Sequence, residues 1–234
     1  MLTLLRSVAT LAGGLVLGCL VAACGAQAPS HAAGDDATAP QRSNNATSRN
    51  VAHVAGRHYN ISVQVPPDWT VGSMEQLQAR DRANRANGDP FLTTEVVAVA
   101  GNGNHSAMLM VSLRQPPLFS SSQLAEVSSA ELQQANAELR QLFTAAPRAS
   151  TRDEIDIPLW ELRQIEFKGE SLRCLELTVL HRVPAEQGPA DLWKTRRLYI
   201  PRPQAELQVE TSYRVRDERR WLPALQAAVL SLDD

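Results

Sequence analysis

The sequence predicts an α+β protein built around a mainly antiparallel sheet, and three features support this fold class. Apolar and polar residues alternate in several segments, as they do in half-buried strands. Consecutive strands are separated by short turns that contain Gly or Pro, which favours antiparallel pairing. Residues 120–142 and 217–232 instead place their apolar side chains at helical spacing, so we expect these helices to cover the sheet.

The overall composition is that of a folded, soluble chain. Of its 234 residues, 44% are hydrophobic and 21% are charged, and the formal net charge is −2. These values exclude a collagen-like chain, a wholly disordered chain, a polytopic membrane protein and a strongly basic nucleic-acid binder. Three cysteines are too few for a disulfide scaffold. We therefore expect no nucleic-acid partner.

Residues 1–23 have the pattern of an export signal peptide. Arg6 is the only charged residue before Asp35, and residues 11–23 form an unbroken run of apolar or small residues. As a helix this run rises about 20 Å, which is short of the roughly 30 Å hydrocarbon core of a bilayer. A positive start followed by a short apolar core predicts a cleavable signal rather than a membrane-spanning helix.

The signal ends in a match to the bacterial lipobox. Val21, Ala22 and Ala23 are an aliphatic and two small residues of the kind that the signal peptidase recognises, and Cys24 follows them. The Cys24 thiol is the only group there that can take a diacylglyceryl thioether, so we predict a palmitate-type lipid anchor on it. Gly25 stands where an Asp would favour inner-membrane retention, and by resemblance to enterobacterial sorting this predicts the outer membrane. The alternative is a plain secretory signal with an incidental cysteine.

Residues 24–55 are predicted to be the lipidated cysteine and a disordered tether. The segment is mostly small and polar and holds no run of large apolar residues, so it cannot bury enough surface to offset its ordering entropy. As a flexible coil it extends about 30 Å. The remaining residues, 56–234, are of a length that suits one folded domain.

The first part of the domain is predicted to be mostly strands. Residues 59–65 alternate between apolar and polar side chains, as a half-buried strand does. Residues 73–87 have weak helical character. Two more strands are expected at residues 93–100 and 107–113, and Gly101–Asn104 between them is a hairpin signal.

The second part is predicted to hold a long helix, a run of strands and a terminal helix. Ser120 and Gln123 fit a capping box at the start of the long helix. The strands that follow are expected at residues 155–167, 172–183, 192–200 and 205–213. In the terminal helix, Trp221 and Leu225 begin an apolar stripe, and Pro223 is expected within the first turn.

This order of elements and one opening motif resemble the PsbP-like superfamily, which includes the extrinsic photosystem II subunit, the DcrB-like bacterial lipoproteins and a eukaryotic Ran-binding import factor. The motif runs from Tyr59 to Trp69 and is similar to the family's aromatic-x-aliphatic-x-x-Pro-x-x-Trp start. The ending on Val229–Leu232 also matches. The resemblance implies an α-β-α sandwich and a role in binding or assembling protein complexes, and it carries over no catalytic or binding residues.

No motif in the sequence points to catalysis, a cofactor or a metal. The chain lacks the nucleophile elbow G-x-S-x-G, the phosphate loop, H-E-x-x-H and C-x-x-C. Asp153, Glu154 and Asp156 form the densest acidic cluster, which we interpret as a solvated strand entry rather than a cation or acid–base site. A catalytic triad that includes His105 or His181 is arithmetically possible, but any chain of this length offers such combinations of residues. The domain is therefore predicted not to be an enzyme and to hold no cofactor or metal.

Cys174 is the one cysteine that remains in the predicted domain. It lies in the strand-like run 172–180, among aliphatic residues. A lone cysteine in such a run predicts a buried, unreactive thiol rather than a nucleophile.

Residues 214–220 hold four arginines just before the last helix. Arg196 and Arg197 are candidates to join them across the sheet. The cluster is open to two interpretations, a basic rim that binds a partner or a surface of salt bridges. Because Asp217 and Glu218 are interleaved with the arginines, the sequence favours salt bridges.

These features together predict an outer-membrane lipoprotein that faces the periplasm. Its domain is expected to be non-enzymatic and to serve protein–protein interaction or envelope assembly. The expected partners are the membrane, through the lipid anchor, and an envelope protein of unknown identity. Two alternatives are an immunity-type inhibitor of a secreted toxin and a carrier of a lipophilic small molecule, and the carrier requires an apolar pocket of a few hundred Å3.

Overall fold

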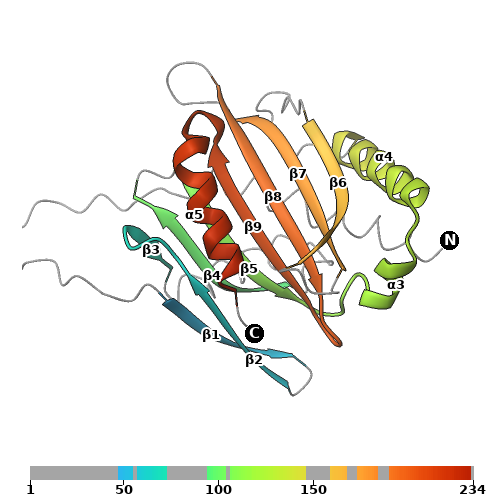
Figure 1. Ribbon diagram of the computed structural model, residues 1–234, viewed down its shortest axis with the longest axis horizontal. Helices are drawn as coiled ribbons and strands as arrows, with labels where there is room; N and C mark the ends of the chain where they lie inside the picture. Colours follow the sequence, from blue (N-terminus) through green and yellow to red (C-terminus); the bar gives the residue numbers. More distant parts are fainter. Residues whose placement is uncertain are drawn as a thin grey trace, which may run out of the picture.

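A computed structural model describes residues 47–54, 57–72, 94–103, 106–145, 159–167, 173–183 and 190–232 (Figure 1). Seven strands form one antiparallel sheet in the order β3-β4-β5-β9-β8-β7-β6, and β1 pairs with β2 in a separate hairpin. The strands are β1 Thr47–Val54, β2 Arg57–Gln64, β3 Trp69–Val71, β4 Thr94–Asn102, β5 Ala107–Arg114, β6 Leu159–Glu166, β7 Arg173–Val183, β8 Asp191–Pro201 and β9 Glu206–Arg214. The helices are α3 Ser121–Glu126, α4 Ser129–Ala145, the short 3-10 helix η1 Val215–Asp217 and α5 Glu218–Leu230.

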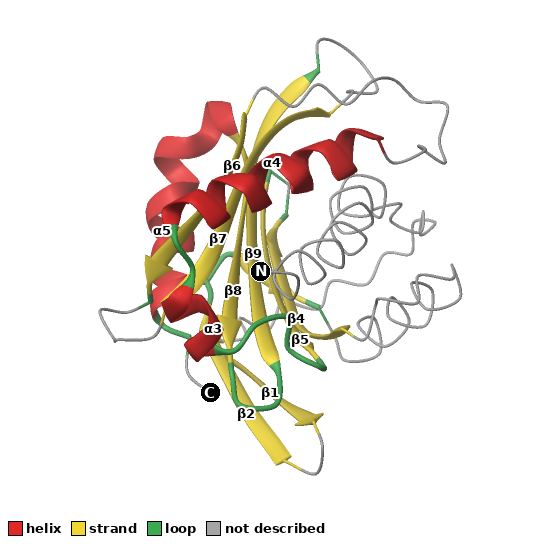
Figure 2. Cartoon of the chain, turned by 90° about the vertical axis from the view of Figure 1, so that its right-hand side faces the viewer, coloured by secondary structure: helices red, strands yellow, loops and turns green. Residues whose placement is uncertain are grey.

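Helices lie on both faces of this sheet, and the predicted α+β fold class is confirmed. In Figure 2 the sheet is seen on edge, with α5 on one side of it and α4 crossing toward the other. Neighbouring residues of a strand point to opposite faces. Accordingly, Leu198 and Ile200 of β8 pack in the cluster that includes α5 residues, whereas Tyr199 packs in the cluster that includes α3 and α4 residues. We call these two sides the α5 face and the α4 face.

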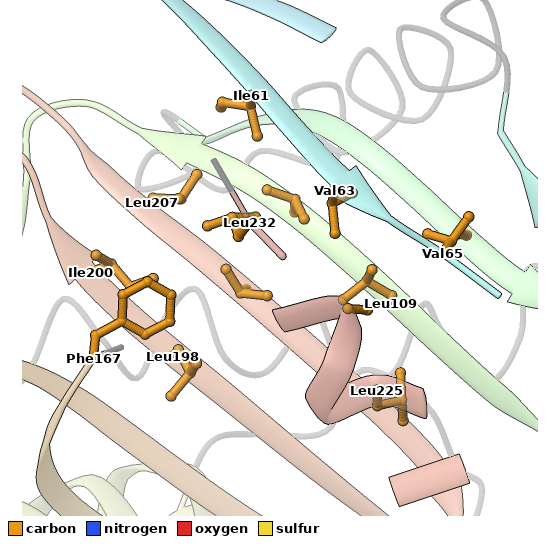
Figure 3. Packing of buried hydrophobic residues seen from close by; sticks show 14 of the residues in the cluster. Ile61, Val63, Val65, Leu109, Phe167, Leu198, Ile200, Leu207, Leu225 and Leu232 are labelled. Carbon is orange, nitrogen blue, oxygen red and sulfur yellow. The ribbon is translucent and has the colours of Figure 1, made fainter. Parts of the chain in front are cut away.

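The α5 face holds the larger core, and the β1–β2 hairpin contributes to it. Ile61, Val63 and Val65 of β2 and its following turn point toward the sheet in Figure 3, where Leu225 and Leu232 also lie. The Gln64 amide donates to Ser231 Oγ at 2.8 Å, which joins β2 to the end of α5. The C-terminal helix and the first hairpin therefore cover the same face.

The α4 face holds a second core at the β6 and β7 side of the sheet. Trp160, Leu162 and Leu177 are buried there, and Leu124 of α3 and Ala135 of α4 pack on them. Both helices thus use the apolar stripe that the sequence predicts for residues 120–142.

The strand β1 lies in a segment that the sequence assigned to the disordered tether. It pairs along its whole length with β2, from Thr47 opposite Gln64 to Val54 opposite Arg57. Strand pairing is made by backbone hydrogen bonds, which need no apolar side chain, so composition alone missed it. The predicted boundary after residue 55 therefore falls inside a hairpin.

The predicted long helix is two helices, because a second capping box interrupts it. The first box is confirmed, with the Gln123 amide donating to Ser120 Oγ and the Ser120 amide donating to Gln123 Oε1. At Ser128 the pattern repeats, since the Ser128 amide donates to Glu131 Oε2 at 3.0 Å and the Glu131 amide donates to Ser128 Oγ at 3.3 Å. These hydrogen bonds lower the pKa of Glu131 and start α4 afresh.

Pro223 lies beyond the first turn of α5, where the sequence placed it wrongly. The helix begins at Glu218, directly after the 3-10 turn. Because proline has no amide hydrogen, Pro223 leaves the Arg219 carbonyl without its usual helical hydrogen bond. Both residues are exposed, so water can donate to that carbonyl.

Several predicted features lie outside the described residues. They are the lipobox residues Val21, Ala22, Ala23 and Cys24, the helical segment 73–87, His105 and the acidic cluster Asp153, Glu154 and Asp156. Within the described ranges, no helix is both long and apolar enough to cross a membrane.

Candidate ligand-binding pocket

A pocket of about 380 Å3 lies between α5 and the sheet, and we call it the α5 pocket. Its apolar residues from the sheet side are Ile165, Phe167, Leu198 and Val209. Its apolar residues from the helix are Leu222, Leu225, Val229 and Leu230. The volume falls within the range of about 300–1,000 Å3 that is typical of small-molecule sites, which are mostly apolar with a few polar groups.

The pocket exists because α5 covers only part of its face. Figure 1 shows α5 lying over the β9 and β5 side of the sheet, while β7 and β6 continue beyond it. The fully buried stripe of the helix is Trp221, Leu225 and Ala228. Leu222 and Val229 lie beside that stripe and are only partly buried. The space between them and the sheet forms the pocket.

Glu176 of β7 and Arg196 of β8 line the polar side of the pocket, as does Glu166, and the register of β6, β7 and β8 sets the neighbours of Glu176. Arg163 of β6 is opposite Glu176 of β7, and Glu176 is opposite Leu198 of β8. Two residue pairs further along, on the same face, Thr178 is opposite Arg196. Two arginines and a threonine therefore surround the Glu176 carboxylate on the α5 face.

The Glu176 carboxylate is fully buried and shared between two guanidinium groups. Arg163 donates to Oε1 from Nε at 3.0 Å and from Nη2 at 2.6 Å, and Arg196 donates to Oε2 from Nη2 at 2.6 Å. Thr178 Oγ1 adds a hydrogen bond of 3.2 Å. Burial acts to raise the pKa of Glu176, but the hydrogen bonds and charges of Arg196 and Arg163 outweigh it and lower that pKa.

The charged residues that line the pocket are Glu166, Glu176 and Arg196, and Arg163 reaches Glu176 from β6. Two guanidiniums face one ionised carboxylate, and the arginine side chains are 51% exposed at Arg163 and 25% exposed at Arg196. A guanidinium carries five N–H donors, and Arg196 donates from Nη2 to the Glu176 carboxylate.

Near Tyr213, the pocket lies next to a second polar group of contacts. Tyr213 lines the pocket, and its hydroxyl donates to Glu218 Oε1 at 2.8 Å. Lys194 Nζ lies 3.0 Å from the same oxygen. The hydrogen bond from Lys194 and then that from Tyr213 lower the pKa of Glu218, while burial and Glu218 raise the pKa of the Tyr213 hydroxyl. These groups anchor the start of α5 to β8 and β9.

The described residues bring no catalytic constellation together. His181 lies on β7, where burial lowers the pKa of its imidazole, and it does not line the α5 pocket. Cys174 is fully buried, as predicted, in the α5-face core. Among the described residues, no group of three or more His, Cys, Asp and Glu is arranged to hold a metal ion.

The arginines before α5 make ion pairs, and their partners differ from those predicted. Arg214 and Arg216 lie 3.4 Å and 3.2 Å from the Asp191 carboxylate at the start of β8. Arg220 lies 3.7 Å from Asp68, and its guanidinium stacks over Trp221 at 4.3 Å. The interleaved Asp217 was expected to be a partner, but the acids that pair come from other segments.

Arg196 and Arg197 point to opposite faces of the sheet, and each pairs with a glutamate there rather than joining that arginine cluster. Arg196 belongs to the α5 pocket. Arg197 pairs with Glu210 on the α4 face, and both are buried. Both were candidates to join that cluster, and both instead form salt bridges with glutamates of neighbouring strands.

The comparisons with known proteins concern the fold. No family model matches the chain, and no curated protein matches it. A solution structure of cyanobacterial PsbP from Synechocystis is similar with a TM-score of 0.42 and 10% identity, and covers 88% of this chain and 99% of its own. The structure of LpqN of Mycobacterium tuberculosis, described as involved in cell envelope biogenesis, has a TM-score of 0.37 and 12% identity, over 80% of this chain and 91% of its own. The Ran-binding protein Mog1p of Saccharomyces cerevisiae has a TM-score of 0.34 and 12% identity, over 80% and 95%.

The identities are 10–12%, so the α+β fold class rests on the chain's own sheet and helices.

Sequence reasoning missed the α5 pocket, although one signal for it is visible. Glu176 is a lone acidic residue within the apolar run 172–180. An acidic residue in a buried strand needs a cationic partner, which directs attention to arginines on the neighbouring strands. Which arginines meet it depends on strand order and register, and these cannot be read from local pattern.

Proposed function

We propose that this protein is a lipoprotein of the bacterial cell envelope that holds a non-enzymatic binding domain. The observation that carries the proposal is the lipobox, with Val21, Ala22 and Ala23 preceding Cys24 at the end of a short apolar run. A lipid on Cys24 would anchor the chain to a membrane, and the absence of Asp after it favours the outer membrane, on the periplasmic side. The domain would then act on an envelope protein as its partner.

The arrangement of polar side chains supports a binding rather than a catalytic role. In the α5 pocket, Glu176 is held ionised in ion pairs with Arg163 and Arg196, which leaves it a poor general base. His181, the one described histidine among the earlier catalytic candidates, lies away from that pocket. A site of this kind is suited to hold a ligand or a partner in place.

The anchor is tested by metabolic labelling of the full chain. Cells that express it are grown with radiolabelled palmitate, and the wild-type protein is expected to incorporate label and to fractionate with membranes. The variant Cys24→Ala should lose both. Cys19→Ala should keep both, because Val16–Cys19 matches the lipobox less well, with bulky Leu17 where a small residue is preferred. Continued labelling of Cys24→Ala would rule out the proposed lipidation site.

A second candidate function, a carrier of a lipophilic small molecule, is favoured by one specific observation. The α5 pocket has the volume that this hypothesis requires and an apolar lining from both the sheet and α5. A carrier tethered at a membrane would also stand beside a source of lipophilic molecules. The two functions are compatible, because the pocket takes up one edge of α5 and leaves the rest of the domain surface free.

A further inference from the structure

We propose that the α5 pocket holds one acyl chain of the protein's own lipid anchor at Cys24. The inference rests on the proposed lipidation and specifies what the pocket takes up, an uncharged alkyl chain that is covalently part of the same molecule. The domain would then be held against the membrane at its α5 face.

The apolar lining of the pocket suits an alkyl chain. Leu198 and Val209 are cross-strand neighbours on β8 and β9 and form its floor. Val229 and Leu230 line it from α5, and Leu230 is 61% exposed at the rim. A chain that lay here would remove these side chains from water, and each of its buried methylenes would contribute to binding.

The charged residues of the pocket do not call for a charged head group. Glu166, Glu176 and Arg196 line the pocket. Arg163 and Arg196 each lie 2.6 Å from the Glu176 carboxylate, so these three side chains pair with one another. Glu161 shares this face of the sheet, two residues from Arg163 on β6. An acyl chain that is joined through an uncharged ester or amide therefore matches the site.

The described part of the chain starts beside the end of α5 that lines the pocket. Thr47, its first residue, is opposite Gln64, and residues opposite each other in a sheet lie about 5 Å apart between their Cα atoms. The Gln64 amide donates to Ser231 Oγ, directly after Leu230. Figure 1 accordingly shows the β1–β2 hairpin next to the end of α5. The segment that leads back to Cys24 therefore joins the domain near the exposed rim of the pocket.

The length of that segment allows the anchor to reach the pocket. Thr47 follows Cys24 by 23 residues. Fully extended, this length of chain spans at most about 75 Å. Because the acyl chain and the pocket belong to one molecule, the effective concentration of the chain at the pocket is on the order of millimolar.

The anchor can place one chain in the pocket without releasing the protein from the membrane. A diacylglyceryl group on Cys24 supplies two acyl chains, and acylation of the amine that signal cleavage would expose adds a third. Two lipid chains suffice for stable anchoring. Transfer of the third from the bilayer keeps it out of water and covers the exposed Leu230 and the partly buried Leu222 and Val229. A volume of about 380 Å3 suits one ligand of drug size, so it accepts one chain and not the whole anchor.

The test is photocrosslinking from the anchor itself. Cells that express the full chain are grown with a palmitate analogue that carries a diazirine at its chain end. The purified protein is reconstituted in phosphatidylcholine vesicles with an equal amount of the full chain from cells grown on heavy nitrogen without the analogue. After irradiation, mass spectrometry identifies the peptides joined to the Cys24 lipid. We expect adducts on the pocket residues of α5 and β8, and on light chains only.

Matched variants locate the adducts. Val229→Trp should fill the pocket and lower the yield of adducts on β8 about tenfold. Ala227→Trp introduces the same side chain at an exposed position of α5 outside the pocket and should leave the yield unchanged. Circular dichroism of each variant checks that it is folded.

The outcomes separate the inference from the proposed lipidation. Absence of the diazirine from Cys24 would overturn the lipidation and the inference with it. A labelled Cys24 whose adducts are with phosphatidylcholine alone would overturn the inference and leave the lipidation standing. Adducts on heavy chains as often as on light chains would mean that the pocket takes a neighbour's anchor, which overturns occupancy by its own. An unchanged yield in Val229→Trp would show that the adducts arise outside the α5 pocket and would also overturn the inference.

Discussion

Glu176 and Glu206 are buried carboxylates in the same sheet, and their surroundings shift their pKa values in opposite directions. Glu176 accepts hydrogen bonds from two arginines, and its pKa is lowered despite burial. Glu206, which is 1% exposed, has its pKa raised because burial outweighs the hydrogen bonds from Gln208 and the Leu118 amide. The folded state therefore stabilises the charge of Glu176 and disfavours the charge of Glu206.

The first prediction is a difference in pH dependence between two matched variants. A lowered pKa contributes stability above the ordinary value of 4.5, which is lost as the pH falls through the lowered pKa. We expect Glu176→Gln to reduce the free energy of unfolding by about 2 kcal/mol at pH 7, and this effect should shrink toward zero in acid. Urea denaturation across the pH range measures it.

The control is Glu206→Gln. A raised pKa means that ionisation of Glu206 costs stability as the pH rises through its ordinary value, so this variant should gain stability at pH 7 relative to wild type. If both variants lost the same free energy at every pH, the proposed environments of the two carboxylates would be wrong.

The sequence predicted the contacts or burial of single residues where the cause lies within a few residues along the chain. The capping box at Ser120 and Gln123 is confirmed because both partners lie within one turn. The burial of Cys174 is confirmed in a strand that also holds the buried Leu175 and Leu177. The contact of Glu176 with Arg163 and Arg196 spans three strands, and no pattern within one strand predicts it.

At the scale of elements, α4 protects the edge of the sheet. β6 is the last strand, and the amide groups on its outer side have no neighbouring strand. The Leu162 amide instead donates to Asn136 Oδ1 of α4 at 3.0 Å, and Gln164 Nε2 donates to the Leu124 carbonyl at the end of α3. An edge strand covered in this way is less available for pairing with another chain.

The second prediction concerns this edge. Asn136→Ala should leave the Leu162 amide without its acceptor, reduce the free energy of unfolding by about 1 kcal/mol and increase aggregation on heating. Asn136→Asp keeps an oxygen acceptor at the same place, so it should reduce the free energy of unfolding by less than Asn136→Ala does. Thermal unfolding followed by light scattering distinguishes the two variants. A larger loss in Asn136→Asp than in Asn136→Ala would contradict the role of the acceptor.

The elements were predictable where their side chains carry the signal. All four strands expected between residues 155 and 213 are present as β6 to β9, since each holds several aliphatic or aromatic residues. The break between α3 and α4 was missed although Ser128 and Glu131 spell a capping box, because the leucine spacing continues across it. The strand β1 was missed because its stability comes from backbone pairing with β2.

At the scale of the whole molecule, two cores share the same strands. Leu198 and Ile200 of β8 lie in the α5-face core, whereas the intervening Tyr199 lies in the α4-face core. In β7, Cys174 and Leu175 are divided between the two cores in the same way. Unfolding either core would disrupt strands that the other core also needs, so the shared sheet couples the unfolding of the two cores.

The third prediction is that both cores unfold in one cooperative transition. Leu109→Ala removes side-chain volume from the α5-face core, and Leu177→Ala does so in the α4-face core, at positions that are each 1% exposed. Each variant should lose about 3 kcal/mol, and the transitions followed by far-UV circular dichroism and by tryptophan fluorescence should coincide. Because the strands are shared, the two probes should also coincide when only one core is weakened. A transition in two steps for either variant would mean that the faces unfold independently, and the pocket beneath α5 would then open without loss of the α4-face core.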